Sequence, residues 1–153
     1  MAILIDSNVL IYMFDGRDET KRQKAIATVI ALADSNEGRL SAQCVSEFYS
    51  VTTKSKPGTS PMLSATLAGQ QADTLTRTFE TFPITPQVVL EAIRGVRAHQ
   101  LSFWDAQIWA AARLNQIPIL FTEDFNPGTV LEGVRFFNPF APEFDLRSLL
   151  GRS

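Results

Sequence analysis

Short apolar runs alternate with longer amphipathic segments along almost the whole chain, and this alternation limits the folds that are open to it. The first run, Ala2–Ile5, ends at Asp6, as a buried strand followed by a helix start does. Further strands are expected at residues 39–41, 82–84, 117–121 and 134–137. Because the intervening segments are long enough for crossover connections, we expect a three-layer α/β/α sandwich around a mostly parallel sheet of about five strands.

The segments between these runs carry apolar residues at helical spacing. The expected helices cover residues 20–32, 42–54, 60–81, 86–99 and 101–116. Ser102 is placed to cap the last of them, with Asp105 three residues further on. In residues 60–81 the expected core anchors are Leu63, Leu67, Leu75 and Phe79.

Length and composition are those of one soluble globular domain, expected over residues 1–153, with 45% hydrophobic and 20% charged residues. The longest purely apolar stretch, Val9–Phe14, is far shorter than a membrane span, and no secretory leader is recognisable. A cytoplasmic location is therefore expected. Cys44 is the only cysteine, which excludes an internal disulfide and a cysteine-built zinc site, and we expect it to be an inert, packed thiol.

Acidic residues stand where functional groups collect in a parallel sheet, at the carboxyl ends of strands. Asp6 and Asp124 follow two of the apolar runs, and Glu47 and Asp105 fall on helices expected to flank the same edge. Carboxylates gathered there would repel one another unless cations bridged them, and oxygen ligands select Mg²⁺ or Mn²⁺. Each acid also has a plainer reading, as a helix cap, a capping partner, a solvated helix residue or a turn residue.

Five segments, taken in order, resemble the PIN-domain family, and more narrowly the VapC-type toxins of toxin-antitoxin pairs. The resemblance runs from residue 2 to about residue 140 and is carried by Ile3–Leu10, Ser46–Phe48, Leu101–Ile108, Leu120–Phe125 and Phe137–Phe140. It implies that Asp6, Glu47, Asp105 and Asp124 are catalytic residues that bind the metal. It also places two polar side chains, Asn8 and Thr122, beside the metal.

Two residues in these segments are less typical. Gln107 stands where the family more often has an apolar residue, and Glu123 is an alternative to Asp124 as a ligand.

The function implied by the resemblance is that of a metal-dependent endoribonuclease, probably the toxin of such a pair, that hydrolyses RNA with one or two Mg²⁺ or Mn²⁺ ions. A bound ion would activate a water for in-line attack on phosphorus, and Asp105 would help to orient that water. The resemblance further implies a homodimer and an antitoxin protein that plugs the cleft. Residues 60–74, with Met62, Leu63 and Leu67, are a candidate dimer surface.

The formal charge of −2 speaks against a protein that binds nucleic acid by bulk positive charge alone. Basic residues that are candidates for phosphate contacts are Lys21, Arg22, Lys24, Lys54, Lys56, Arg94, Arg97 and His99, although most such clusters are solvated helix faces. We expect the lone His99 to be a helix-end residue, and Trp104 and Trp109 to be core or interface residues.

Other functions fit the sequence less well. A haloacid-dehalogenase-like hydrolase needs a second aspartate two residues after the first, where Asn8 stands, and a receiver domain needs a lysine after a late strand, which is missing beyond Phe125. A third alternative keeps the fold as a catalytically silent module that acts in complex with a DNA-binding antitoxin. The presence of all four acids favours the enzyme.

Overall fold

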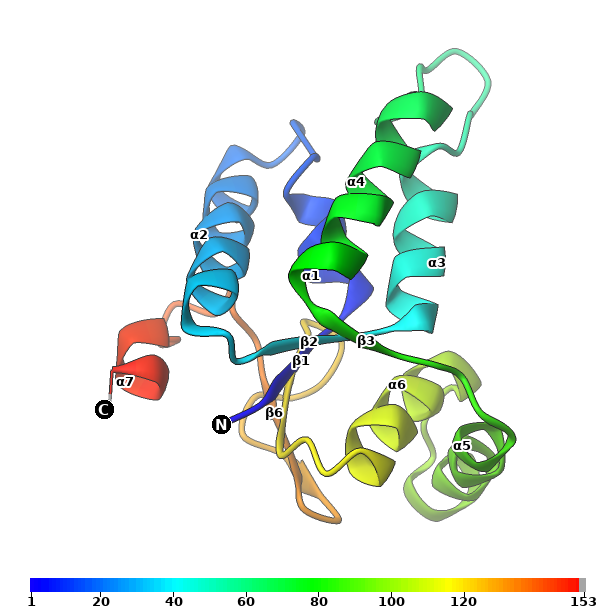
Figure 1. The fold of residues 1–153 in the computed structure, drawn as a ribbon, viewed down its shortest axis with the longest axis vertical. Coiled ribbons are helices and arrows are strands. Elements are labelled where there is room, and N and C mark those ends of the chain that lie inside the picture. Colours follow the sequence, from blue (N-terminus) through cyan, green and yellow to red (C-terminus); the bar gives the residue numbers. More distant parts are fainter. Residues whose placement is uncertain (152–153) are drawn as a thin grey trace.

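A mostly parallel sheet lies between two layers of helices in the computed structural model, which describes residues 1–151 (Figure 1). Its strand order is β3-β2-β1-β4-β6-β5, and only the β5–β6 pair is antiparallel. The strands are β1 (Ile3–Ile5), β2 (Gly38–Ser41), β3 (Glu80–Phe82), β4 (Ile119–Phe121), β5 (Val130–Leu131) and β6 (Val134–Phe137). The predicted α/β/α sandwich with a mostly parallel sheet is confirmed.

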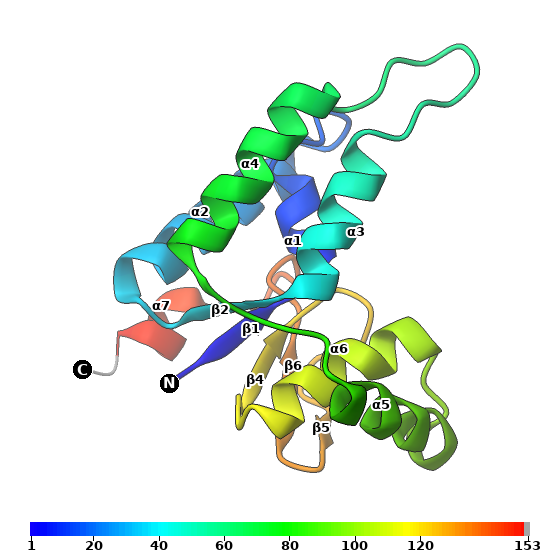
Figure 2. The same cartoon turned by 45° about the vertical axis from the view of Figure 1, so that its right-hand side comes forward.

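The helices divide between the two faces of this sheet (Figure 2). On one side lie α1 (Ser7–Tyr12), α2 (Glu19–Ser35), α3 (Ala42–Thr52) and α4 (Ala65–Thr78), and on the other α5 (Pro86–His99) and α6 (Phe103–Leu114). A short helix, α7 (Leu146–Leu150), follows the sheet near the carboxyl terminus. None of the helices in residues 1–151 combines the length and apolar character needed to cross a membrane.

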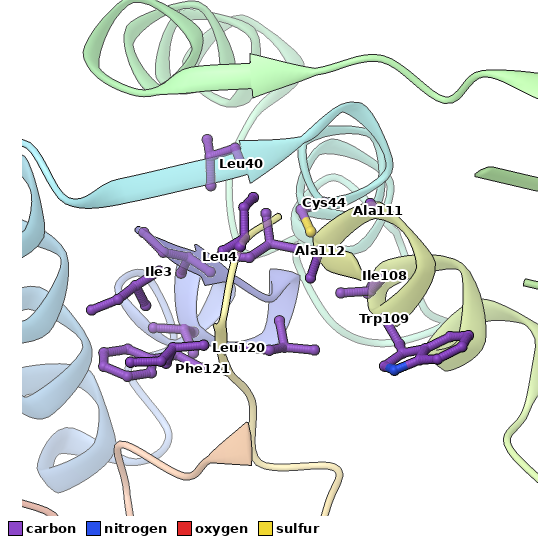
Figure 3. Packing of buried hydrophobic residues seen from close by; sticks show 14 of the residues in the cluster. Ile3, Leu4, Leu40, Cys44, Ile108, Trp109, Ala111, Ala112, Leu120 and Phe121 are labelled. Atoms are coloured by element: carbon purple, nitrogen blue, oxygen red, sulfur yellow. The ribbon is translucent and has the colours of Figure 1, made fainter. Parts of the chain in front are cut away.

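The central strands are buried on both faces, which explains why they read as continuous apolar runs. Figure 3 shows their side chains, such as Leu4 and Leu120, packed with residues of β2, α3 and α6. Cys44 of α3 belongs to this core, and burial raises the pKa of its thiol to about 12. The expectation of a packed thiol is therefore confirmed.

Side-chain caps fix where most of the helices begin. Asp6, Asp18, Ser41, Ser64, Thr85 and Ser102 each accept a hydrogen bond from a backbone N–H of the first turn of their helix. The predicted helix over residues 60–81 is too long, because Ser64 caps α4 and Phe79 already has an extended backbone that leads into β3. Leu67, an expected core anchor, is half exposed on α4, whereas Leu75 and Phe79 are buried.

Three further predictions differ from the structure. The third strand ends at Phe82 and does not extend to residue 84, since Pro83 has no N–H to donate to a ladder. The strand β5 was not predicted: it pairs with β6 through a tight turn in which Glu132 and Gly133 both have positive φ, of 47° and 88°. The short helix α7 was also not predicted.

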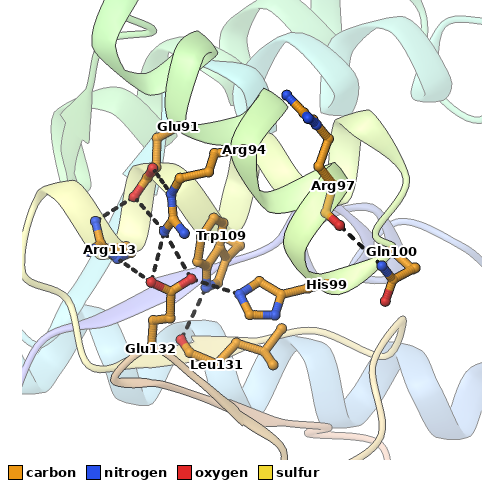
Figure 4. Close-up of polar contacts among 9 residues, drawn as sticks. All are labelled: Glu91, Arg94, Arg97, His99, Gln100, Trp109, Arg113, Leu131 and Glu132. Atoms are coloured by element: carbon orange, nitrogen blue, oxygen red, sulfur yellow. Dashed lines mark hydrogen bonds and ion pairs between the residues drawn. The ribbon is translucent and has the colours of Figure 1, made fainter.

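A polar network ties α5 and α6 to the β5–β6 turn (Figure 4). Glu132 accepts a 2.8 Å hydrogen bond from Arg94 and lies 2.7 Å from Nε2 of His99. Glu91 accepts hydrogen bonds from both Arg94 and Arg113. Arg94 and His99, two of the candidate phosphate contacts, are therefore engaged within the fold.

The two tryptophans have different surroundings. Trp109 is fully buried, donates a 3.1 Å hydrogen bond to the carbonyl of Leu131, and packs against α5 at Gly95. The expectation of a core residue is confirmed for Trp109. It is wrong for Trp104, which is 60% exposed in the first turn of α6.

Candidate functional site

Asp6 and Thr122 meet because β1 and β4 are adjacent parallel strands that end at the same edge of the sheet. The hydroxyl of Thr122 donates a 2.7 Å hydrogen bond to Oδ2 of Asp6, and the backbone N–H of Ser7 donates one of 2.7 Å to Oδ1. Asp6 is only 2% exposed and caps α1. Both of its carboxylate oxygens are thus held in fixed directions.

The environment of Asp6 is unfavourable for a negative charge. Burial, together with the negative charges of Asp124 and Glu47, raises the pKa of Asp6 to about 7, although the hydrogen bonds from Thr122 and Ser7 oppose the rise. Among residues 1–151, no lysine, arginine or histidine forms an ion pair with Asp6, Glu47, Asp105 or Asp124. These four residues, here called the acid cluster, therefore have no counter-charge from the protein.

Asn8 lies one turn into α1, between the ends of the two strands. Its Nδ2 is 3.4 Å from Oδ2 of Asp6 and 3.4 Å from Oγ1 of Thr122. Its amide also opposes the rise in the pKa of Asp124. Within the described part of the chain, its Oδ1 is the one buried side-chain oxygen or nitrogen without a hydrogen-bond partner. An acceptor oxygen in this state is normally explained by an absent water or ion.

Asp124 and Glu123, which follow β4, point to different partners. The backbone N–H of Asp124 donates a 3.1 Å hydrogen bond to Oγ1 of Thr122, and its carboxylate is partly open to solvent. Partial burial and the charges of Asp105 and Glu123 raise the pKa of Asp124. Glu123 instead accepts hydrogen bonds from Tyr12 (2.9 Å) and Lys21 (2.8 Å), so its charge is already balanced within the protein.

Glu47 and Asp105 reach the same edge from helices. Glu47 is half-buried on α3, and its pKa is raised by burial and by the charges of Asp105 and Asp124, while hydrogen bonds from Ser7 and Gln43 oppose this. Asp105 lies in the first turn of α6, where its backbone N–H donates a 3.2 Å hydrogen bond to the Ser102 cap. The structure therefore brings all four predicted acids into one electrostatically coupled group.

The donor set of the acid cluster fits a hydrated divalent cation. Every ligand available is an oxygen, and the set includes the unpartnered Oδ1 of Asn8. In residues 1–151, however, no three acidic, histidine or cysteine side chains converge tightly enough to hold an ion among themselves. Mg²⁺ fits that spacing, because it keeps several waters and is commonly held by one or two carboxylates.

Sequence reasoning missed two polar residues at this site, Ser7 and Gln43. Ser7 directly follows Asp6, and its backbone N–H bonds that carboxylate. Gln43 precedes Glu47 by four residues, which places both side chains on one face of α3. The i,i+4 spacing was a usable signal for Gln43, and the unusual Gln107, whose amide bonds that of Gln43, was another.

Comparisons with known proteins agree with this architecture. Residues 3–127 match the sequence model of the PIN domain. A toxin-antitoxin complex from Klebsiella pneumoniae contains a similar chain, with 20% identity, 90% of this chain and 98% of that chain covered, and a TM-score of 0.66. FitAB bound to an IR36 DNA fragment gives 18% identity, coverage of 93% and 98%, and a TM-score of 0.67.

The sarcin-ricin loop cleaving toxin VapC20 from Mycobacterium tuberculosis is also similar, with 19% identity, coverage of 88% and 99%, and a TM-score of 0.60. At these identities the likeness is one of fold. No curated protein sequence matches the chain.

Proposed function

Because the chain belongs to the PIN domain family, we propose that it is a metal-dependent endoribonuclease and the toxin of a toxin-antitoxin pair. The observation that carries this proposal is the burial of Asp6 next to other uncompensated carboxylates, with its pKa raised to about 7. Such an arrangement destabilises a protein unless a cation binds there, so it is expected at a metal site and not in an ordinary structural cluster.

In this proposal Asp6, Glu47, Asp105 and Asp124 hold Mg²⁺ or Mn²⁺, and the Oδ1 of Asn8 accepts a hydrogen bond from a water of the ion. A divalent cation bound there lowers the pKa of a coordinated water and offsets negative charge on the phosphate. Thr122 and the backbone N–H of Ser7 hold the Asp6 carboxylate in one orientation, which limits the reorganisation needed on binding.

Asp105 is the acid that we propose to orient the attacking water, by accepting a hydrogen bond from it. Its place in the first turn of α6 supports this role, because the Ser102 cap fixes the backbone from which the carboxylate extends. Glu123 is not proposed as a ligand, since Lys21 and Tyr12 occupy its oxygens.

We propose RNA outside a duplex as the substrate, since bases that are not paired can be splayed out and stacked on aromatic side chains. Trp104 offers such a surface next to Asp105: its indole is 60% exposed, and the ring of Phe103 packs edge-on at 5.0 Å. That the similar VapC20 is a sarcin-ricin loop cleaving toxin supports RNA as the substrate class.

The proposed partners are an antitoxin protein and a second copy of the chain. The similar chains from Klebsiella pneumoniae and FitAB come from complexes described as toxin-antitoxin and DNA-bound, respectively, which supports the first. The acid cluster, lacking a counter-charge, would accept a basic side chain of the antitoxin. Leu67 of α4 and Val51 of α3 are exposed and apolar, which supports a dimer contact across this helix pair. Sedimentation of Leu67→Glu beside the unaltered chain tests that contact.

The alternative, a catalytically silent PIN-fold module acting with a DNA-binding antitoxin, is separated from the enzyme by a cleavage assay. The purified chain is incubated with a looped RNA and Mn²⁺, beside Asp6→Asn and the control Asp34→Asn, which alters an exposed residue of α2. Metal-dependent cleavage that Asp6→Asn abolishes and Asp34→Asn keeps supports the enzyme. Equal inactivity of all three proteins, or equal activity, contradicts it.

A further inference from the structure

Two glutamine amides meet in the interior between the helices that carry Glu47 and Asp105. Gln43 of α3 and Gln107 of α6 are each only 4% exposed. The Nε2 of Gln107 donates a 2.8 Å hydrogen bond to Oε1 of Gln43. The Nε2 of Gln43 in turn donates a 3.0 Å hydrogen bond to the backbone carbonyl of Trp104.

The orientation of both amides follows from one acceptor. The carbonyl of Trp104 can only accept, so the NH₂ group of Gln43 must face it, and the Oε1 of Gln43 must then face Gln107. Gln107 consequently presents its NH₂ group to Gln43. The chain of hydrogen bonds has a single direction, and neither amide can be flipped without placing two acceptors against each other.

This chain of hydrogen bonds reaches both acids. The Nε2 of Gln43 also lies 3.5 Å from Oε1 of Glu47, the long limit of a hydrogen bond, and Trp104 directly precedes Asp105. One side chain of α3 thus contacts a carboxylate on its own helix and the backbone of α6 beside the other carboxylate. A buried amide is costly without such partners, and an apolar pair would fill the space without that cost.

Building on the proposed function, we propose that Gln43 and Gln107 form a positioning pair that sets the separation and orientation of Glu47 and Asp105 for one shared divalent cation. Neither glutamine is proposed to touch the cation. Groups that orient metal ligands from behind typically contribute 10–100-fold to metal affinity, and we expect a loss of about that size when this pair is broken.

The experiment is a calorimetric titration of the full-length chain with Mn²⁺, with urea unfolding measured on the same samples. Gln43→Met and Gln107→Met each remove one amide while nearly keeping the side-chain length. The double variant leaves neither amide unpaired, so it is expected to fold in any case. Gln70→Met, at an exposed position of α4, is the matched control.

The proposal predicts that each single variant binds Mn²⁺ about 10–100-fold more weakly than the unaltered chain, and that the double variant loses no more than one single variant does. Gln70→Met should bind like the unaltered chain. Unchanged Mn²⁺ affinity in the double variant, or losses that add fully, would overturn the positioning pair alone. Absence of Mn²⁺ binding in the unaltered chain would overturn the proposed function, and the pair with it.

Discussion

Thr122 donates its hydroxyl hydrogen to Oδ2 of Asp6 over 2.7 Å, which joins two residues that are 116 positions apart in the chain. The parallel register of β1 and β4 pairs Ile5 with Phe121, so the residues that follow each strand are brought side by side. The same Oγ1 accepts a hydrogen bond from the N–H of Asp124. One threonine therefore fixes the relative positions of two of the proposed metal ligands.

Replacing this hydroxyl should destabilise the charged form of Asp6. We predict that Thr122→Val lowers the free energy of unfolding of the metal-free chain by about 1.5–3 kcal/mol at pH 8, the usual range for a hydrogen bond to a charged group. The loss should be smaller at pH 5, where Asp6 is mostly protonated. Urea unfolding at both pH values measures it, and Thr122→Ser, which keeps the hydroxyl, should lose less. Equal losses at both pH values would contradict this account.

The stability of the metal-free chain should fall as the pH rises. The pKa of Asp6 is raised from 3.8 to about 7 in the folded state, so between these values the folded chain binds more protons than the unfolded chain does. The free energy of unfolding should therefore decrease across this window, by at most about 4 kcal/mol from Asp6.

Urea unfolding between pH 4.5 and pH 8.5, on the order of the expected titration window, follows this change in the unaltered chain and in Asp6→Asn. The variant should be the more stable protein at pH 8, because it carries no buried charge, although it should have lost the proposed activity. A variant that is less stable than the unaltered chain at pH 8 would show that Asp6 is not strained by its charge.

Close packing of α5 on α6 depends on Gly95. A Cβ added there would stand 2.6 Å from a ring carbon of Trp109, which is fully buried and cannot move away. We predict that Gly95→Ala destabilises the chain by about 1–3 kcal/mol in thermal or urea unfolding. The control is Gly69→Ala on α4, where nothing lies within 4 Å of the added atom and a stabilisation of about 0.5–1 kcal/mol is expected.

Much of this fold was accessible from the sequence because its local signals agree with one another. The strand β1 is an apolar run that ends in a polar residue, and α5 has proline in its first turn, so their positions were predictable. The strand β5 was missed because its two residues take their structure from pairing with β6 and from the positive φ of Glu132, neither of which leaves a periodic pattern.

The candidate site was accessible in part for the same reason. Parallel topology alone places Asp6 beside Thr122, and family resemblance added Glu47 and Asp105. The Gln43–Gln107 contact joins residues 64 positions apart through their side chains, and the burial of Gln107 leaves no signature in local periodicity. Trp104 was misread because an aromatic residue in a helix is usually buried, while this one faces solvent.

Exposure of Trp104 next to Asp105 leads to a prediction about substrate binding. Trp104→Ala should raise the KM for a looped RNA about tenfold or more, since stacking of one base contributes about 1–3 kcal/mol, and should change kcat much less. Trp104→Phe should recover part of the loss. Steady-state cleavage kinetics measure both values. A change in sedimentation with KM unaltered would instead make Trp104 a contact between two copies of the chain.

Uptake of a divalent cation by the acid cluster is the claim that the other functional predictions depend on. Its direct measurement is a calorimetric titration of the metal-free chain with Mn²⁺ at neutral pH, beside Asp6→Asn and Asp34→Asn. The account predicts saturable binding by the unaltered chain and by Asp34→Asn, and binding at least about tenfold weaker by Asp6→Asn. No heat of binding in the unaltered chain, or equal affinity in all three proteins, would contradict it.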